Sequence, residues 1–245
     1  HMLKTFKGKD NYADLKKLKE VADQKIKEWL IKDEKDEVEG DNVFELIQAE
    51  PSVKSFFAEV KNGSSEAANI LEDLLISWDI YTRWRKGSHK DRISYMRKNF
   101  MENYKKKLQN SDLPKVFLKF GQVHTSRELS LNAYDLGHLV TELAKKNGTE
   151  AITINSWTRY YQSEEGLSDY AKHPYFKSVQ EFFKMADQNQ WTIIDLKAIR
   201  ADYETGKIKL PENGDFHDIL KLINGYDYQL ILPVDNMITY NIDLP

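Results

Sequence analysis

The sequence contains no cysteine, so disulfide bonds, thiolate nucleophiles and cysteine-ligated metals are all excluded. It also lacks any apolar run near the roughly 20 residues that a membrane-spanning helix needs. A formal net charge of −3 argues against a general nucleic-acid binder, because such a protein first needs a basic surface. With 40% hydrophobic and 31% charged residues, the composition predicts a soluble globular protein.

The short motifs of familiar cofactor enzymes are also missing. We find no Walker A loop, no dinucleotide-binding Gly-x-Gly-x-x-Gly, no Gly-x-Ser-x-Gly elbow and no His-Glu-x-x-His helix. No internal repeat or low-complexity tract is present either. Most of the familiar cofactor chemistries are therefore unsupported, and the sequence identifies no cofactor and no metal site.

The 245 residues are enough for one sizeable domain, or for a domain with a helical appendage. His1-Met2 is typical of the scar of a cleaved expression tag, and no signal peptide follows it. A signal peptide could have been removed ahead of Leu3, and many exported bacterial proteins also lack cysteine. The compartment, cytoplasmic or exported, and the oligomeric state therefore stay open.

The first hundred residues carry helical patterns and no strong strand candidate. Apolar side chains recur at helical spacing, and turn residues or Pro51 separate the successive segments. The predicted helices are 11–32, 43–47, 52–60, 66–84 and 90–108. The sequence therefore predicts a helical region over residues 3–110.

The pattern changes at Asn110-Ser111-Asp112-Leu113-Pro114, after which short β-branched runs alternate with helical segments. Such alternation is typical of α/β proteins with a parallel sheet. The predicted strands are 116–120, 151–155, 192–195 and 229–232, and the predicted helices are 129–146, 175–188 and 215–223. We therefore expect an α/β region over 111–245, with a mainly parallel sheet flanked by helices, and it could form one continuous domain with the helical region.

Two long polar segments, 156–174 and 200–215, separate these elements. Loops of that length are uncommon in a compact domain unless they are functional or mobile. We therefore expect both segments to be loops of one of these kinds.

The stretch from Lys115 to Arg127 is predicted to organise the α/β region. Val116 to Phe120 is a β-branched and aromatic run closed by Gly121, which predicts a buried strand and then a sharp turn. Five polar side chains follow the run: Gln122, His124, Thr125, Ser126 and Arg127. Because ligands bind at the carboxyl ends of strands in open α/β sheets, we expect the functional site in this loop.

His124 is the first candidate for catalysis, because an unperturbed imidazole with a pKa of about 6.5 can transfer protons at neutral pH. The alternative is a packed turn in which the imidazole only satisfies backbone groups. Arg127 could bind an anionic group or a developing oxyanion, or it could form a loop-to-helix salt bridge. His138, in the following helix, could line the site or could be a packing or surface residue.

Other strand ends also carry polar residues. Asn155, Trp157 and Arg159 leave one strand and could wall a pocket, and Asp195 could be a site carboxylate or a turn residue. A basic cluster with interleaved aromatics has the composition used for phosphate contacts and base stacking. Its members are Tyr81, Arg83, Trp84, Arg85, Lys86, His89 and Lys90. Cations that favour the carboxyl terminus of a helix explain this cluster equally well.

Two segments resemble a known family. Val-Phe-Leu-Lys-Phe-Gly-Gln-Val-His-Thr-Ser-Arg at 116–127, then Tyr-Asp-Leu-Gly-His-Leu at 134–139 and Asn147-Gly148, resembles the second conserved block of the erythromycin esterase and ChaN-like, TraB-related superfamily. Asp-Arg-Ile-Ser-Tyr-Met-Arg-Lys-Asn-Phe at 91–100 is similar to the family's helix that precedes the His-bearing strand. The resemblance covers roughly residues 90–240.

The resemblance implies a hydrolase that attacks an ester or related acyl bond with an activated water. His124 would transfer the proton, and Arg127 or Arg92 would bind charge. The residues expected to contact or support the small-molecule substrate are His138, Tyr134, Asn99, Asn155 and Trp157. For the helix that carries Arg92, an ordinary solvated, charged helix face is the alternative.

The resemblance leaves the cofactor open, because no metal is obligatory for the esterases and haem binding is known among ChaN-like relatives. The family's earlier block, a strand with a Gly-x-x-His-type loop and a downstream Glu, supplies its principal general base and has no counterpart here. The chain would then be the carboxyl-terminal part of a longer protein, or a divergent member that has lost that element.

Two rival classes stay open. The first is a non-catalytic ligand-binding or protein-interaction module that uses the same strand-end pocket. The second is a nucleic-acid-associated protein that binds through Trp84 and its basic neighbours, although the acidic balance makes nucleic acid an unexpected partner.

Overall fold

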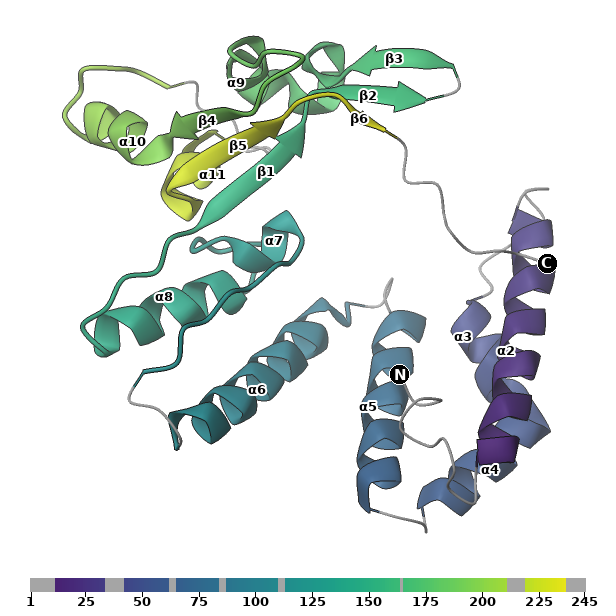
Figure 1. Ribbon diagram of the computed structural model, residues 1–245. Coiled ribbons are helices and arrows are strands. Elements are labelled where there is room, and N and C mark those ends of the chain that lie inside the picture. Colours follow the sequence, from purple (N-terminus) through teal and green to yellow (C-terminus); the bar gives the residue numbers. More distant parts are fainter. Residues whose placement is uncertain are drawn as a thin grey trace. The chain divides into compact units, whose positions relative to one another are not determined.

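The computed structural model describes residues 12–33, 42–61, 65–83, 87–109, 113–163, 165–210 and 219–236. The chain divides into two compact units, His1–Ser94 and Tyr95–Pro245, which we describe separately. Figure 1 shows helices in the first unit and strands with flanking helices in the second. Within the described ranges, no helix is both long enough and apolar enough to cross a membrane.

The first unit is helical, as the sequence predicts. Its helices are α2 (Tyr12–Asp33), α3 (Val43–Ala49), α4 (Pro51–Lys61) and α5 (Ser65–Thr82), and the boundary between the units falls within α6 (His89–Leu108). The apolar stripes of α2 to α5 meet in one core. The buried side chains of this core are Leu18, Ile47, Val53, Phe56 and Trp78.

Two sequence signals set the limits of α3 and α4. Asn42 caps α3, because its Oδ1 accepts a hydrogen bond of 2.9 Å from the backbone N–H of Phe44. Its Nδ2 donates to the carbonyl of Tyr81 at 2.9 Å and so fixes the start of α3 to the end of α5. Pro51 opens α4, where a missing N–H costs little because the first helical N–H groups have no intrahelical partner.

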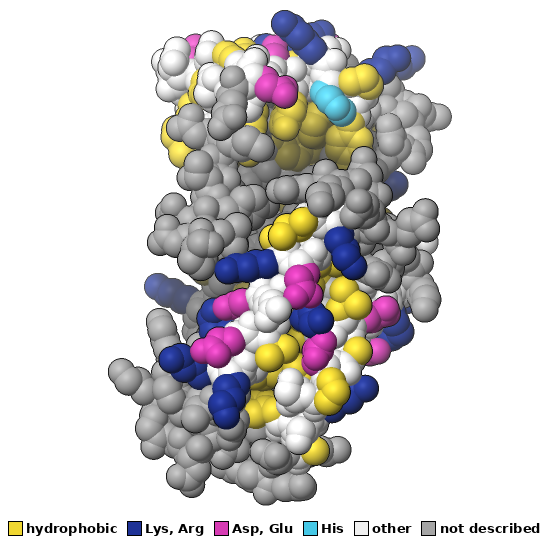
Figure 2. Space-filling model, turned by 90° about the vertical axis from the view of Figure 1, so that its right-hand side faces the viewer, with side chains coloured by type: hydrophobic (Ala, Val, Ile, Leu, Met, Phe, Trp, Pro, Cys, Tyr) yellow, Lys and Arg dark blue, Asp and Glu magenta, His cyan; other side chains and the backbone are white. Residues whose placement is uncertain are grey.

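The outer face of α2 carries charged side chains of both signs (Figure 2). Lys19 pairs with Asp23, and Lys25 lies 2.9 Å from Glu50 and 3.6 Å from Glu28. Interspersed charges of opposite sign cancel at a distance, so this face lacks the single-sign field that attracts nucleic acid.

The second unit is a mixed α/β fold. Its three-stranded sheet has the order β1 (Ile154–Thr158), β5 (Tyr228–Leu232) and β4 (Thr192–Asp195), in which β1 and β5 are parallel and β4 and β5 antiparallel. The prediction of a mainly parallel sheet is therefore wrong. Two helices, α10 (Leu196–Glu204) and α11 (Ile219–Gly225), connect β4 to β5 and pack on each other. A pair of helices brings the chain back to the edge of the sheet at which β4 ends, so β5 starts there and runs antiparallel to β4. A single crossover helix would instead carry the chain to the opposite edge and give parallel strands.

A second small sheet has the order β3-β2-β6, with β2 (Tyr160–Ser163) antiparallel to β3 (Gly166–Asp169) and parallel to β6 (Asp235–Asn236). The first two strands lie in the segment that we expected to be a polar loop, so that expectation is wrong. These short strands are half-exposed and lack an apolar alternation, so the sequence pattern does not predict them. The expected loop 200–215 likewise begins inside α10.

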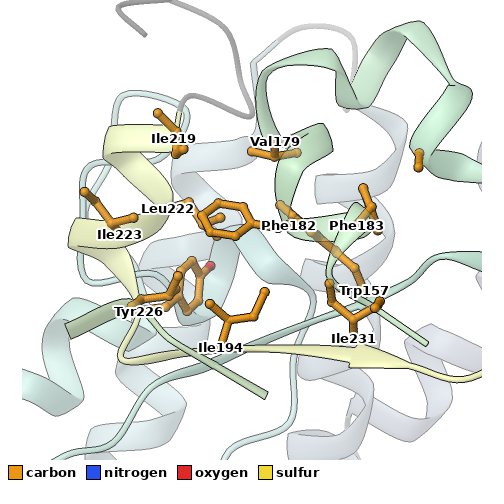
Figure 3. Packing of buried hydrophobic residues seen from close by; sticks show 13 residues of the cluster. Trp157, Val179, Phe182, Phe183, Ile194, Ile219, Leu222, Ile223, Tyr226 and Ile231 are labelled. Carbon is orange, nitrogen blue, oxygen red and sulfur yellow. The ribbon is translucent and has the colours of Figure 1, made fainter. Parts of the chain in front are cut away.

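One face of the three-stranded sheet carries the core. Side chains from each strand, from α11 and from α9 (Gln180–Lys184) converge there (Figure 3). They include Trp157, Ile194, Ile231, Phe182, Phe183, Leu222 and Ile223. On the opposite face Ile154 and Ile193 are 53% and 68% exposed, so the sheet is covered on one side by the described part of its own unit.

Other predictions for this unit have mixed outcomes. The strands 192–195 and 229–232 are confirmed, and 151–155 is displaced to 154–158. The helix 129–146 begins only at α8 (Leu136–Lys146), but it ends as predicted at Asn147-Gly148, where Gly148 has φ 65°. The helix 175–188 is a 3₁₀ helix, η3 (Pro174–Val179), followed by α9, and η2 (Tyr170–Lys172) precedes them.

The segment from Val116 to Phe120, predicted to be a buried strand, has no regular secondary structure. Phe117 is 90% exposed. The central strand β5 already has β1 and β4 on its two sides, and no strand of the described chain pairs with the segment. The prediction is wrong because an apolar run becomes a strand only where a neighbour supplies its hydrogen bonds.

Candidate functional site

The polar loop packs closely against α8. It begins with one helical turn, α7 (Gln122–Thr125), after Gly121, whose φ of −59° any residue can adopt. The position that requires glycine is Gly137 in α8. A Cβ added there would lie 2.1 Å from the carbonyl oxygen of Thr125 and 2.6 Å from that of Ser126. The absent side chain therefore lets the loop backbone reach the helix.

His124 and Asp135 form a buried pair between the loop and the first turn of α8. The Nδ1 atom of His124 lies 2.6 Å from Oδ2 of Asp135, and the two residues are 7% and 1% exposed. Oδ1 of Asp135 accepts a hydrogen bond of 2.7 Å from the N–H of Leu136, so the same carboxylate caps α8. A carboxylate at Nδ1 keeps the ring proton there, which makes Nε2 the basic nitrogen.

Arg127 and Asp227 form a second buried pair at the other end of the loop. Nη1 of Arg127 lies 3.0 Å from Oδ1 of Asp227, and the backbone N–H of Arg127 donates to the carbonyl of Gly225 at 3.1 Å. Oδ2 of Asp227 accepts from the N–H of Thr153 at 2.8 Å. Within the described chain, Nη2 of Arg127 is buried and makes no hydrogen bond. Arg127 is thus anchored just before β5, and its Nη2 has no partner among the residues that the structure describes.

His138 and Tyr134 lie together beside Arg127. Nδ1 of His138 lies 3.0 Å from the carbonyl oxygen of Arg127, and its ring stacks on that of Tyr134 with the centroids 4.1 Å apart. Arg97 of α6 donates to the carbonyl of Tyr134 at 2.7 Å, while the Tyr134 side chain stays half-exposed. Two of the predicted substrate-binding residues therefore meet at the loop.

A small cleft lies on the second unit next to this loop. Its walls come from the loop, β1 and α11, and include Gln122, Ser126, Glu128, Trp157, Lys221 and Tyr226. Its volume of about 60 Å³ is small against the roughly 300–1,000 Å³ of pockets that bind drug-sized ligands. His124 does not line it.

Gln122 is held in place at one wall of the cleft by two aromatic donors. Nε1 of Trp157 donates to Oε1 of Gln122 at 3.2 Å, and the hydroxyl of Tyr226 donates to its backbone carbonyl at 2.5 Å. Burial raises the pKa of Tyr226 to about 12, so this hydroxyl is a neutral donor at neutral pH. The cleft therefore has a fixed amide and an apolar aromatic wall.

The other predicted site residues have different surroundings. Asn155 is buried in the sheet, and its Nδ2 donates to Oε1 of Gln229 at 2.7 Å, so it does not wall the cleft. Asn99 lies on α6, and its carbonyl accepts a hydrogen bond of 2.9 Å from a side chain one turn later. Arg92 belongs to the first unit, where its guanidinium lies over the ring of Tyr81, 5.6 Å from the centroid.

Arg159 and Asp195 both make contacts that give them a structural role. Nε of Arg159 lies 3.0 Å from Oδ1 of Asp169, and its Nη1 donates to the carbonyls of Phe183 and Ala186 at the end of α9. This guanidinium lowers the pKa of Asp169. Asp195 caps α10 by accepting from the N–H two residues later at 2.9 Å.

Within the described part of the basic cluster, Arg83 is paired with carboxylates. Arg83 lies 2.5 Å from Asp79 and 3.0 Å from Asp91. The residues 84–86, including Trp84, lie outside the described residues. The observed pairs are those of a surface charge network.

Three residues of the site were not singled out from the sequence as site residues: Asp135, Asp227 and Tyr226. Asp135 had a recognisable signal, because an Asp just before a run of helical apolar residues is a preferred N-cap. Asp227 precedes a strand about a hundred residues after its partner Arg127, and no local pattern links the two.

The described residues contain no group of three His, Asp or Glu side chains that could hold a metal ion. Comparison of the chain with known protein families, with curated proteins and with solved structures finds no match.

Proposed function

We propose that the second unit is a hydrolase of ester or related acyl bonds, in which His124 takes the proton from an attacking water. The observation that supports this proposal is the 2.6 Å contact between His124 Nδ1 and the buried carboxylate of Asp135. A buried carboxylate at Nδ1 orients the imidazole, fixes its tautomer and stabilises the imidazolium that forms when Nε2 takes a proton. The resemblance of 116–127 and 134–139 to the erythromycin esterase and ChaN-like superfamily agrees with this role.

In this proposal, Arg127 stabilises the negative charge that develops on the substrate. Its Nη1 is occupied by Asp227, whereas its buried Nη2 has no hydrogen-bond partner within the described chain. A buried donor without a partner costs free energy, which a substrate oxygen at that atom would recover. His138 and Tyr134 would then flank the substrate, because they lie at the carbonyl of Arg127.

A second candidate function is a ligand-binding module without catalysis. The observation in its favour is that the cleft is lined by Gln122, Trp157 and Tyr226 but not by His124. A fixed amide beside aromatic rings is sufficient to orient a small ligand, since binding sites combine apolar walls with a few placed polar groups.

The deciding experiment measures hydrolysis of a panel of esters and lactones by the chain and by His124→Ala. General acid–base catalysis typically contributes 10²–10⁴-fold, so kcat should fall by at least about 100-fold while the circular dichroism spectrum stays unchanged. His173→Ala is the matched control, because His173 is an exposed histidine of the same unit and should keep full activity.

The same panel separates the two candidates. Ligands that raise the unfolding temperature of the chain without being hydrolysed would support the binding module and contradict the hydrolase. A chain that neither hydrolyses nor is stabilised by any member of the panel would contradict both.

A further inference from the structure

The segment from Lys115 to Phe120 carries strand-forming residues but has no backbone partner among the residues that the structure describes. It runs without turn or bend, and no hydrogen bond of the described residues involves its backbone N–H or C=O groups. Phe117 is 90% exposed, and Val116 and Phe120 are 42% and 45% exposed. Backbone groups without a partner in the described chain, beside exposed apolar side chains, have the properties of an edge strand that another strand can join.

We propose that two copies of this chain associate through this segment, as antiparallel strands related by a two-fold axis at Leu118. A two-fold interface is the commonest form of self-association, and it needs one self-complementary patch. The new ladder would satisfy the backbone groups that the described chain leaves unpaired. It would also explain why the sequence carries a strand pattern at a place where the described part of the single chain offers no neighbouring strand.

The charges of the segment favour this register over the one whose axis lies at Phe117. With the axis at Leu118, Val116 faces Phe120 of the partner subunit and Leu118 faces its own copy. Phe117 then faces Lys119 of the partner subunit, which is a favourable aromatic–cation pair. With the axis at Phe117, Lys115 would instead face Lys119 of the partner subunit, and like charges directly opposite each other are destabilising.

The association would affect the candidate site through the contact between Phe120 and His124. The ring of Phe120 lies edge-on to the imidazole of His124, with the centroids 6.3 Å apart. Pairing of the segment would therefore hold the entry to α7 in one position. The interaction surface does not depend on the hydrolase proposal, because it rests only on the segment itself.

Cysteine cross-linking tests the register, since the chain has no cysteine of its own. Residues that face each other in an antiparallel pair have Cα atoms about 4.5–5.5 Å apart, within the reach of a disulfide. Leu118→Cys should therefore form a disulfide-linked dimer on mild oxidation. Phe117→Cys is the matched control, because its own copy lies diagonally, about 7–8 Å away, and should cross-link poorly. Equal cross-linking of both variants, or none with Leu118→Cys, would overturn the register.

Light scattering over a range of concentrations tests the association itself. The mass should rise with concentration from 28.7 kDa towards twice that value. Phe117→Lys should stay at the lower mass, because it places two cations opposite each other, and its fold should be retained since Phe117 is exposed. Ile193→Lys, at another exposed apolar position, should associate like the unmodified chain. A constant mass of 28.7 kDa, or loss of association in Ile193→Lys but not in Phe117→Lys, would overturn the proposal.

Discussion

Asp135 and Asp227 are two buried carboxylates that hold the two ends of the same polar loop, but their partners differ in kind. Asp135 faces the imidazole of His124 at 2.6 Å, and Asp227 faces the guanidinium of Arg127 at 3.0 Å. Each carboxylate also accepts a hydrogen bond from a backbone N–H, at 2.7 Å and 2.8 Å. Geometry and burial are therefore similar at the two ends of the loop.

The difference lies in what the side chain opposite each carboxylate can do. A guanidinium stays charged at every accessible pH, so the pair with Arg127 is a permanent anchor. An imidazole can gain or lose a proton near neutrality, so the pair with His124 can take part in chemistry. The comparison leads us to expect that Asp227 matters most for stability and Asp135 most for activity.

The largest stability effect is expected for Asp227→Ala. This change leaves the largely buried guanidinium of Arg127 without its counter-charge and the N–H of Thr153 without its acceptor. Removal of one partner of a buried pair typically costs about 3–5 kcal/mol. Urea unfolding measures the loss, and Asp187→Ala, an exposed carboxylate of the same unit, is the control. A loss below 1 kcal/mol would show that the pair is no anchor.

Gly137→Ala is expected to detach the loop on the Asp135 side. The new Cβ would meet the backbone carbonyls of Thr125 and Ser126 at 2.1 and 2.6 Å, and backbone atoms cannot give way by side-chain rotation. Overpacking of this kind costs about 3 kcal/mol. Gly121→Ala is the matched control, because nothing lies within 4 Å of an added Cβ there and its φ is −59°. Equal unfolding midpoints for the two variants would contradict the close approach.

The sequence predicted the helices better than the sheet, and the reason is physical. Helices such as α2 and α6 satisfy their backbone groups internally, so the local apolar spacing is sufficient to place them. Strands depend on neighbours far along the chain. The predicted strand 192–195 is confirmed because β5 lies beside it, whereas 116–120 is also an apolar run but has no neighbouring strand within the described ranges.

The site was also predicted only in part. The polar loop and the placement of His138 and Tyr134 beside it followed from the order of elements along the chain. The partner of Arg127 could not be predicted, because Asp227 lies beside it only as a result of the helical connection between β4 and β5. The sequence pattern wrongly predicted a mainly parallel sheet, in which that connection would have a different course.

Tyr226 lies next to Asp227 and donates to the carbonyl of Gln122, so it links the two ends of the loop. Burial raises its pKa from 10.0 to about 12. The folded state therefore holds the proton more tightly, and its stability is fully present below about pH 10 and is lost as the pH rises towards 12. A shift of about two units corresponds to about 2–3 kcal/mol.

Unfolding measured between pH 9 and 12 should show this loss in the unmodified chain. In Tyr226→Phe the alkaline loss should be correspondingly smaller, while the lost hydrogen bond should cost about 1 kcal/mol at pH 7. Tyr175→Phe is the control, because that tyrosine is half-exposed. Identical alkaline profiles for the chain and Tyr226→Phe would contradict the burial of the hydroxyl as the cause.

Asp135→Asn is expected to have the smallest effect on stability and a large one on activity. Asn is as good an N-cap as Asp, so α8 keeps the acceptor for the N–H of Leu136 and the free energy of unfolding should change by about 1 kcal/mol or less. The amide cannot hold the ring proton on Nδ1 of His124, so the imidazole takes the tautomer whose Nε2 is no base, and kcat should fall at least about 100-fold. Asp227→Asn is the matched control and should instead show a large loss of stability, because the guanidinium of Arg127 loses its counter-charge. If the two variants lost stability and activity in the same proportion, the two carboxylates would serve one common purpose and the distinction between anchor and reactive pair would be wrong.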